Sequence, residues 1–396
     1  MANSVSSFGD WLAILALFSL VAFRMHGTSS QVSGMMISFV IPAALVGPVA
    51  GVFVDRWNVK STMIGSDLIR AVVTALLALA HKLPHIYALV FTLSAVSCFF
   101  TPAQNVAIRL IVREEELLAA NALNTQVVHL NKVVGPAIAG VLVAWAGENA
   151  CFAIDSATFL FSAAMLSVLT LRREGAGARK GISSVVKEFS EGIKYILQHR
   201  AIRFVVFAMG IAILALGAFD ALISIYVRDV LRSKSQLFGA VVSAIGVSTI
   251  LGALLITKFA GRFGKGILKV YLVVLGIFGL GAFIVLITAA GNVPVTLFGC
   301  LLAGLGVACV LIPSQTLFQE ETPPSLLGRV SSTSTSLVTV CQAVAFAMAG
   351  TAADWIGIRR LYYLLGLMLI LTAVVGFVYA KACLMREKSV PPVYAS

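Results

Sequence analysis

Apolar residues fill this chain in twelve long runs, separated by short segments except between the sixth and seventh runs, where the polar stretch is long. A membrane-spanning helix needs about 20 predominantly apolar residues, and every run is long enough to meet that requirement. We therefore predict twelve spanning helices. They are residues 4–24, 32–54, 62–81, 86–109, 120–145, 150–171, 202–227, 235–258, 267–290, 293–318, 330–353 and 360–381.

Two distant stretches of the chain share five residues at a constant separation of 210 positions. The identical pairs are Ala137/Ala347, Ala139/Ala349, Gly140/Gly350, Trp145/Trp355 and Gly147/Gly357. A repeat of this length divides the predicted helices into two tandem sets of six. Parallel repeats about an axis along the membrane normal occur in one large class of transport proteins. We predict an all-α integral membrane fold of twelve transmembrane helices in two six-helix halves.

The polar segments set the domain boundaries. We assign residues 1–171 to the N-terminal half, 172–201 to a linker, 202–381 to the C-terminal half and 382–396 to a tail. Apolar residues recur in the linker at helical spacing, which predicts an amphipathic helix on the inner membrane surface. They are Val185, Val186, Phe189, Ile193, Ile196 and Leu197. Helix 1 is short before Asp10, so we expect either a clipped helix or a natural start upstream of Met1.

Composition agrees with a membrane protein, because 59% of the 396 residues are hydrophobic and 12% are charged. The net charge of +12 is explained by topology. With both termini in the cytoplasm, 20 of the 29 Lys and Arg residues fall on the inner side, 7 on the outer side and 2 within helices. We predict a multi-pass protein of the plasma or inner membrane, and the basic residues give no reason to expect a nucleic-acid partner.

Motifs for catalysis or metal binding are absent from the sequence. It contains no His-Glu-x-x-His, no P-loop lysine motif, no Gly-x-Ser-x-Gly and no paired cysteines. The six cysteines are scattered, which is typical of apolar packing residues. We therefore predict no enzyme activity, no metal and no cofactor, including ATP.

The loop after helix 2 contains Gly47, Gly51, Asp55 and Arg56. The two glycines are one helical turn apart, which lets a neighbouring helix approach closely. The segment resembles the loop 2–3 signature of the major facilitator superfamily, Gly-x-x-x-Asp-Arg. That resemblance implies that Asp55 helps to lock the two halves together on the inner side. The alternative is a tight loop in which Arg56 only sets topology.

Helix 5 contains Gly135, Pro136 and Gly140, and these residue types allow tight packing and a bend. The segment resembles a fifth-helix signature typical of proton-coupled exporters; the alternative is an ordinary packing kink. With Gly328 and Arg329 in the tenth loop, these stretches resemble the macrolide-efflux and enterobactin-exporter-like branch of the superfamily. The resemblance covers nearly the whole chain and implies an exporter driven by ion or proton exchange.

Ionisable residues inside a span are costly and are candidates for function. The candidates are Asp10, Asp67, Arg70, Lys132, Asp155 and Asp220. Asp67 and Arg70 are three residues apart, so we expect a structural pair near the inner end of helix 3. Asp155 is about five residues from the outer end of helix 6. We interpret it as a structural residue within reach of interfacial water.

Lys132 is about 18 Å from either end of its helix and cannot reach the interface. We expect Lys132, Asn131 and His129 to face a central cavity, with Asp10 as partner or proton carrier. Asp220 is the candidate from the second half. A buried structural salt bridge is the alternative for the charged residues.

The sequence therefore favours a secondary transporter that exports an amphipathic or lipophilic small molecule, such as a drug, macrolide or siderophore. It would work by alternating access, in exchange for protons. The expected partners are the bilayer, the substrate and protons, and we expect a monomer. Two alternatives stay open: a lipid or lysophospholipid translocator of the same fold, and a membrane sensor or scaffold that transports nothing.

Overall fold

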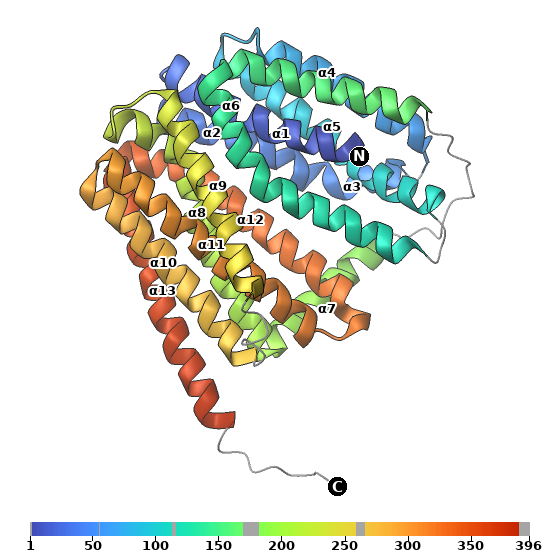
Figure 1. The fold of residues 1–396 in the computed structure, drawn as a ribbon. Helices are drawn as coiled ribbons and strands as arrows, with labels where there is room; N and C mark the ends of the chain where they lie inside the picture. Colours follow the sequence, from blue (N-terminus) through green and yellow to red (C-terminus); the bar gives the residue numbers. More distant parts are fainter. Residues whose placement is uncertain (1, 55, 113–115, 169–181, 259–265, 388–396) are drawn as a thin grey trace. The chain divides into compact units, whose positions relative to one another are not determined.

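The computed structural model describes residues 2–54, 56–112, 116–168, 182–258 and 266–387. All regular structure in these ranges is helical (Figure 1). The helices of the first half are α1 Ala2–Ser19, η1 Leu20–Arg24, α2 Ser29–Leu45, α3 Gly47–Val54, α4 Val59–Leu77, α5 Leu83–Ile111 and α6 Leu117–Val168. They are followed by α7 Ile182–Gln198, α8 Arg200–Ile225, η3 Tyr226–Val230, α9 Ser235–Lys258, α10 Gly266–Ala290, α11 Val293–Glu321, α12 Pro324–Ile356 and α13 Ile358–Glu387.

Each of the twelve predicted spans overlaps one or two of these helices, and residues 169–171 of the sixth lie outside the described residues. Among the described residues, nine helical stretches are long and apolar enough to cross a membrane. The second span is divided into α2 and α3 at Val46, and the third, α4, carries Asp67 and Arg70 within its apolar length. The fifth span is the first part of α6, which continues into the sixth across Gly147. The prediction of an all-α fold with twelve spans is confirmed.

The backbone repeats between the halves at the separation found in the sequence. Gly147 has φ 79° and Gly357 has φ 84°, and only glycine adopts such angles readily. Each lies between two consecutive spans, which explains why both positions are glycine. The helices α5 and α11 both contain 29 residues, start 210 positions apart and have a proline in their first two positions.

Two tryptophans also repeat at this separation. Trp145 is 85% exposed and Trp355 is 92% exposed, and each precedes one of the glycines between spans. Aromatic rings of this kind are enriched where a membrane meets water. These positions are therefore consistent with interfacial ends of the fifth and eleventh spans.

The helices form two compact units, and each is described here by itself. Unit 1 comprises Met1–Arg179, Ala218–Gly246 and Phe346–Ile358. Unit 2 comprises Lys180–Gly217, Val247–Ala345 and Arg359–Ser396. Unit 1 thus contains the first half together with segments of α8, α9 and α12, so contacts between the two halves can be seen inside it.

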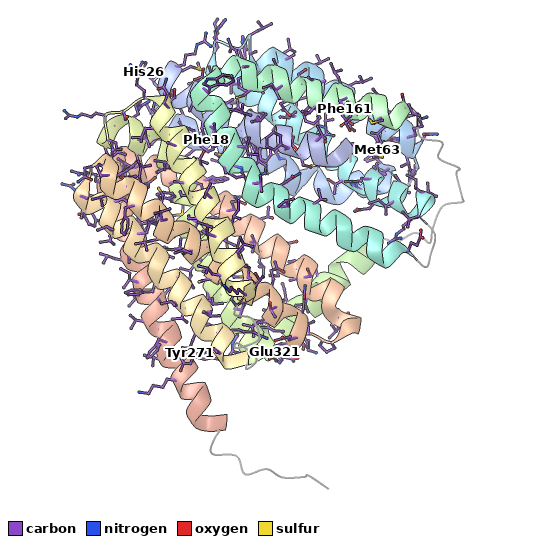
Figure 2. The ribbon with its side chains drawn as sticks, viewed as in Figure 1. Phe18, His26, Met63, Phe161, Tyr271 and Glu321 are labelled. Carbon is purple, nitrogen blue, oxygen red and sulfur yellow. The ribbon has the colours of Figure 1, made fainter. Side chains whose placement is uncertain are left out.

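The helix α1 provides much of the core of unit 1. It packs chiefly against α6. Leu12 and Ala16 of α1 are completely buried, and so is Val21 in η1, which continues the helix. The ring of Phe18 (labelled in Figure 2) lies 6.1 Å from that of Phe238 in α9. Because nearly every face of α1 is covered, its few polar residues must find partners inside the unit.

In unit 2, α10 and α11 pack very closely. A Cβ added at Gly276 would lie 2.7 Å from the carbonyl oxygen of Gly306, so neither glycine tolerates a side chain without movement. The last helix, α13, runs to Glu387, beyond the predicted end of the last span at residue 381. Helix-forming residues such as Ala382 and Leu384 continue past the apolar run, which explains the longer helix.

The predicted linker contains the helix α7, which includes all six of the apolar positions, while its place on the inner membrane surface stays a prediction. Its last turns pack inside unit 2, where Ile196 is buried against Leu317 of α11 and Val330 of α12. The hydroxyl of Tyr195 donates a hydrogen bond of 2.8 Å to the carbonyl oxygen of Glu321. Glu321 and Tyr271 are labelled at this end of unit 2 in Figure 2.

Candidate functional site

A buried ion pair lies in the middle of α4. Asn58 starts this helix by accepting a hydrogen bond of 3.0 Å from the backbone N–H of Ser61. Asp67 is 0% exposed, Arg70 is 4% exposed, and their side chains form the predicted pair. Because α4 begins at Val59, earlier than expected, the pair lies near the middle of the helix and not near its end, where the sequence placed it.

Aromatic rings hold the Arg70 guanidinium on both sides. Its carbon is 4.3 Å from the ring centre of Phe100 and 4.4 Å from that of Phe159, which places cation–π contacts on the charge. Among the described residues, Asp67 Oδ2 and Arg70 Nε have no hydrogen-bond partner. The Arg70 guanidinium is thus contacted by one carboxylate and two rings.

A second carboxylate, Asp155 of α6, faces the same region and is completely buried. The hydroxyls of Thr74 and Thr158 each lie 3.4 Å from one of its oxygens. A Cβ added at Gly9 of α1 would overlap Asp155, so α1 covers this carboxylate. The expectation that Asp155 reaches interfacial water is wrong, because α1 and α4 both pack against α6 there.

Asp10 follows Gly9 and completes the group. Its side chain is half-buried, and it lies within electrostatic range of Arg70, Asp67 and Asp155. We call Asp10, Asp67, Arg70 and Asp155 the acidic cluster. It sets three carboxylates against one cation among the described residues.

Several predicted residues fall outside the described residues. All of Asp55 does, as do the side chains of His129, Lys132 and Arg329 and the surroundings of Gly51 and Gly328. Their roles stay predictions, and so does a contact between Asp10 and Lys132. Asn131 is half-buried on α6, and Asp220 is exposed on α8 beside the buried Phe219.

The loop after helix 2 differs from its prediction at Gly47. A Cβ added there would meet nothing within 4 Å, so the expected close helix approach at this glycine is wrong. The helix of the second span is instead interrupted at this point, since α2 ends at Leu45 and α3 begins at Gly47. Arg56 is exposed just beyond α3.

The small residues of the fifth span contact two neighbouring helices. A Cβ added at Gly135 would overlap the indole of Trp11 in α1, and one at Gly140 would overlap the carbonyl oxygen of Gly239 in α9. The hydroxyl of Ser243, also in α9, donates a hydrogen bond of 2.6 Å to Ala137 O. These contacts join the fifth and eighth spans within unit 1, while Pro136 lies inside α6 between them.

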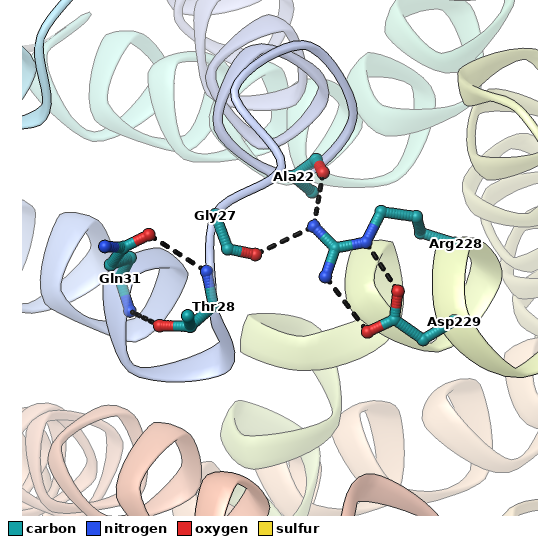
Figure 3. Close-up of polar contacts among 6 residues, drawn as sticks. All are labelled: Ala22, Gly27, Thr28, Gln31, Arg228 and Asp229. Atoms are coloured by element: carbon teal, nitrogen blue, oxygen red, sulfur yellow. Dashed lines mark hydrogen bonds and ion pairs between the residues drawn. The ribbon is translucent and has the colours of Figure 1, made fainter.

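An arginine that the sequence reasoning missed joins the first and seventh spans (Figure 3). Arg228 Nη1 donates hydrogen bonds of 2.6 Å to Ala22 O and 2.8 Å to Gly27 O. Its Nε and Nη2 donate to Asp229 Oδ1 and Oδ2 at 2.6 and 2.9 Å. The acceptor carbonyls are available because α1 ends in a π-helical turn, followed by the Thr28–Gln31 capping box at the start of α2. We call this arrangement the Arg228 clamp.

A third contact joins the second and eleventh spans near the start of α2. The backbone N–H and hydroxyl of Ser30 donate hydrogen bonds of 3.2 and 2.5 Å to Asp354 Oδ2. A Cβ added at Gly350 would lie 2.7 Å from Ser29 O, so α12 lies directly against α2. Three pairs of spans, one from each half in every pair, are thus linked inside unit 1.

The sequence of the chain also matches the model of a known protein family. The model of the Major Facilitator Superfamily matches residues 1–346. The chain belongs to the major facilitator superfamily. It is therefore a multi-pass membrane transporter and not an enzyme.

Individual relatives support the same assignment. The chain is 26% identical over 395 residues to the uncharacterized MFS-type transporter YfiS of Bacillus subtilis (strain 168), covering 98% of this chain and 93% of that one. It is also 26% identical over 375 residues to macrolide efflux protein A of Streptococcus pyogenes, covering 92% of this chain and 91% of that one. These relatives confirm the resemblance to the superfamily and to its macrolide-efflux members.

Solved structures show the same fold. The nucleoside transporter NupG superposes with a TM-score of 0.72 over 95% of this chain and 97% of that chain. The two sequences are only 13% identical, so this likeness concerns the arrangement of helices alone.

Proposed function

We propose that this transporter exports an amphipathic or lipophilic small molecule in exchange for protons, and that the acidic cluster carries the protons. The observation that carries the proposal is the excess of negative charge in the cluster. The similarity to macrolide efflux protein A favours export and a substrate of this kind.

Charge counting explains why the cluster would bind protons. Asp67 and Arg70 neutralise each other, which leaves Asp10 and Asp155 without a cation of their own among the described residues. Uncompensated charges are expensive away from water. Protonation of one or both carboxylates removes this cost. Asp10 is the entry point for the proton, because it is the cluster's one partly exposed carboxylate, whereas Asp67 and Asp155 are 0% exposed.

The helix α1 offers a physical link between the protons and the opening of the transporter. It carries Asp10 in its middle and is followed by Ala22, whose carbonyl the Arg228 clamp holds. The two residues are about 18 Å apart along the helix. A shift of α1 that follows a change of charge at Asp10 would therefore also act on the contacts between halves.

Alternating access requires those contacts to break and re-form. The Arg228 clamp, the Ser30–Asp354 hydrogen bonds and the Gly140–Gly239 contact hold the halves together at the face where α1 meets α2. The distribution of basic residues predicts that this face is external. Release of the substrate to the outside would then need these three contacts to separate.

Flux into inverted membrane vesicles with an imposed proton gradient tests this proposal. The panel should include a macrolide, a lipophilic dye, a catecholate siderophore and a lysophospholipid. We expect gradient-dependent uptake of the macrolide or the dye. We expect that uptake to be lost in Asp10→Asn and in Asp155→Asn, since neither variant can exchange a proton at the changed position.

The matched control is Glu116→Gln, which removes an exposed carboxylate just before α6. It should transport like the native protein. Gradient-driven uptake that persists in either cluster variant, at native protein levels, would count against proton coupling through the cluster. Uptake of the lysophospholipid alone would replace the substrate class with a lipid.

A further inference from the structure

A groove in unit 2 is lined by none of the residues of the acidic cluster or of the contacts between the halves. It has a volume of about 380 Å³ and is walled by α7, α8 and α12. Apolar side chains make up nearly all of its lining, and Arg203 is its one charged residue. Gly210 on α8 adds to the space, because it contributes no side chain to the wall.

The groove has about the length of one leaflet of a membrane. Its α8 wall runs from Arg203 to Leu214, which is about 16 Å along the helix axis. One leaflet of the hydrocarbon core is about 15 Å thick. Arg203 lies near the start of α8, at the end that adjoins the polar linker. The groove is therefore apolar over a length that matches one leaflet and has a cation at the end next to the polar linker.

The positive charge at the mouth of the groove, on Arg203, is accessible to solvent. Arg203 is exposed, and its Nη1 donates a hydrogen bond of 3.0 Å to Leu197 O at the end of α7. This bond positions the guanidinium and uses only one of its five N–H groups. Lys194 is exposed on α7 beside Ile193, which lines the groove. A phosphate matches this arrangement, since guanidinium groups bind phosphate oxygens in pairs.

We propose that this groove binds an anionic phospholipid from the adjoining leaflet, with an acyl chain between α8 and α12 and the phosphate at Arg203. Basic pockets between membrane helices bind such headgroups. A zwitterionic lipid would fit the apolar wall equally well but would gain less from Arg203 and Lys194. The occupant is a resident lipid and not the exported substrate.

Photochemical crosslinking of the full-length protein in nanodiscs tests this inference. The discs consist of phosphatidylcholine with a minor fraction of phosphatidylglycerol that carries a diazirine on one acyl chain. A parallel set carries the same chain on phosphatidylcholine. After illumination, the crosslinked peptides are quantified. We expect the peptides that contain residues 203–214 and 337–341 to be labelled several-fold more by phosphatidylglycerol than by phosphatidylcholine.

Two variants separate the headgroup from the chain. Arg203→Gln should lower the phosphatidylglycerol yield in the groove to that of phosphatidylcholine, and its exposed side chain makes this change compatible with folding. Gly210→Phe should remove groove labelling by both lipids. Gly210→Ala is its control, because the added Cβ would lie 3.6 Å from Cys341 Sγ, an ordinary contact. The outward face of α13, at Leu371, Val374 and Val378, should be labelled equally by both lipids.

Equal labelling of the groove by the two lipids would overturn the inference, as would a phosphatidylglycerol yield that Arg203→Gln leaves unchanged. Loss of labelling on addition of a transported dye would assign the groove to the substrate instead. The comparison of the two lipids is independent of transport, because the crosslink is measured without flux.

Discussion

The Arg228 clamp makes a quantitative prediction about the balance between the two access states. In Arg228→Ala, the hydrogen bonds to Ala22 O and Gly27 O are lost. These bonds join the two halves at one face, so they exist only while that face is held together. Their removal should therefore favour the state in which the face is open.

The size of the effect follows from the geometry. A hydrogen bond from a charged group contributes about 1.5–3 kcal/mol. The Arg228 side chain is 18% exposed, so solvent weakens both bonds and the lower value applies. Two bonds then give about 3 kcal/mol, which corresponds to roughly a hundredfold shift in population.

The assay is the reaction of a cysteine at position 33 with a membrane-impermeant maleimide added from the outside. Ser33 is 2% exposed, and a Cβ added at Gly350 would lie 2.7 Å from the Ser33 Cβ. The hydroxyl of Ser33 has no hydrogen-bond partner among the described residues, so Ser33→Cys sacrifices no bond there. The new thiol becomes accessible only when α2 and α12 separate.

We expect the labelling rate to rise by up to a hundredfold in Arg228→Ala and by less in Arg228→Lys, which keeps the charge but not the fork of donors. Arg24→Ala is the matched control, since Arg24 is exposed and contacts Asn149 at 3.4 Å. If Arg228→Ala is labelled no faster than Arg24→Ala, the clamp does not hold this face together.

Two further substitutions test the packing of unit 1. Gly140→Leu would force a side chain into the carbonyl of Gly239 and should abolish transport while the protein stays in the membrane; Gly65→Ala, where an added Cβ meets nothing within 4 Å, should transport normally. Arg70→Met leaves Asp67 buried without its cation and should lower stability by about 3–5 kcal/mol, measured as thermal unfolding in detergent. Adding Asp67→Asn should restore much of that loss, and a double variant no more stable than Arg70→Met would show that the charge is not the cause.

Helix positions and the internal repeat could be predicted from the sequence because both depend on local pattern. Apolar runs about one membrane thickness long give the spans, and the Gly147/Gly357 identity reflects a backbone angle that other residues rarely adopt. The Asp67–Arg70 pair was also predictable, since both residues share one helix face.

The acidic cluster could not be assembled from a single sequence. Asp10, Asp67 and Asp155 lie on three helices that are far apart in the chain, and periodicity does not specify which helices are neighbours. Gly9 was the available signal, because a glycine beside an acidic residue in a span indicates a close helix contact. It did not identify α6 as the partner.

The Arg228 clamp was missed for a different reason. Arg228 lies at the end of a span, where charged residues ordinarily face water, and so it was counted only as an outer basic residue. Its acceptors are backbone carbonyls freed by the π-helical turn after α1. No side-chain pattern records those groups.

The most direct test of the central claim separates proton coupling from substrate movement in Asp155→Asn. Reconstituted vesicles would be used to measure gradient-driven uptake and, without any gradient, exchange of labelled for unlabelled substrate. An asparagine resembles a carboxyl group that keeps its proton. The account predicts that driven uptake is lost while exchange continues near the native rate. Driven uptake at the native level would contradict a role for the acidic cluster in carrying protons.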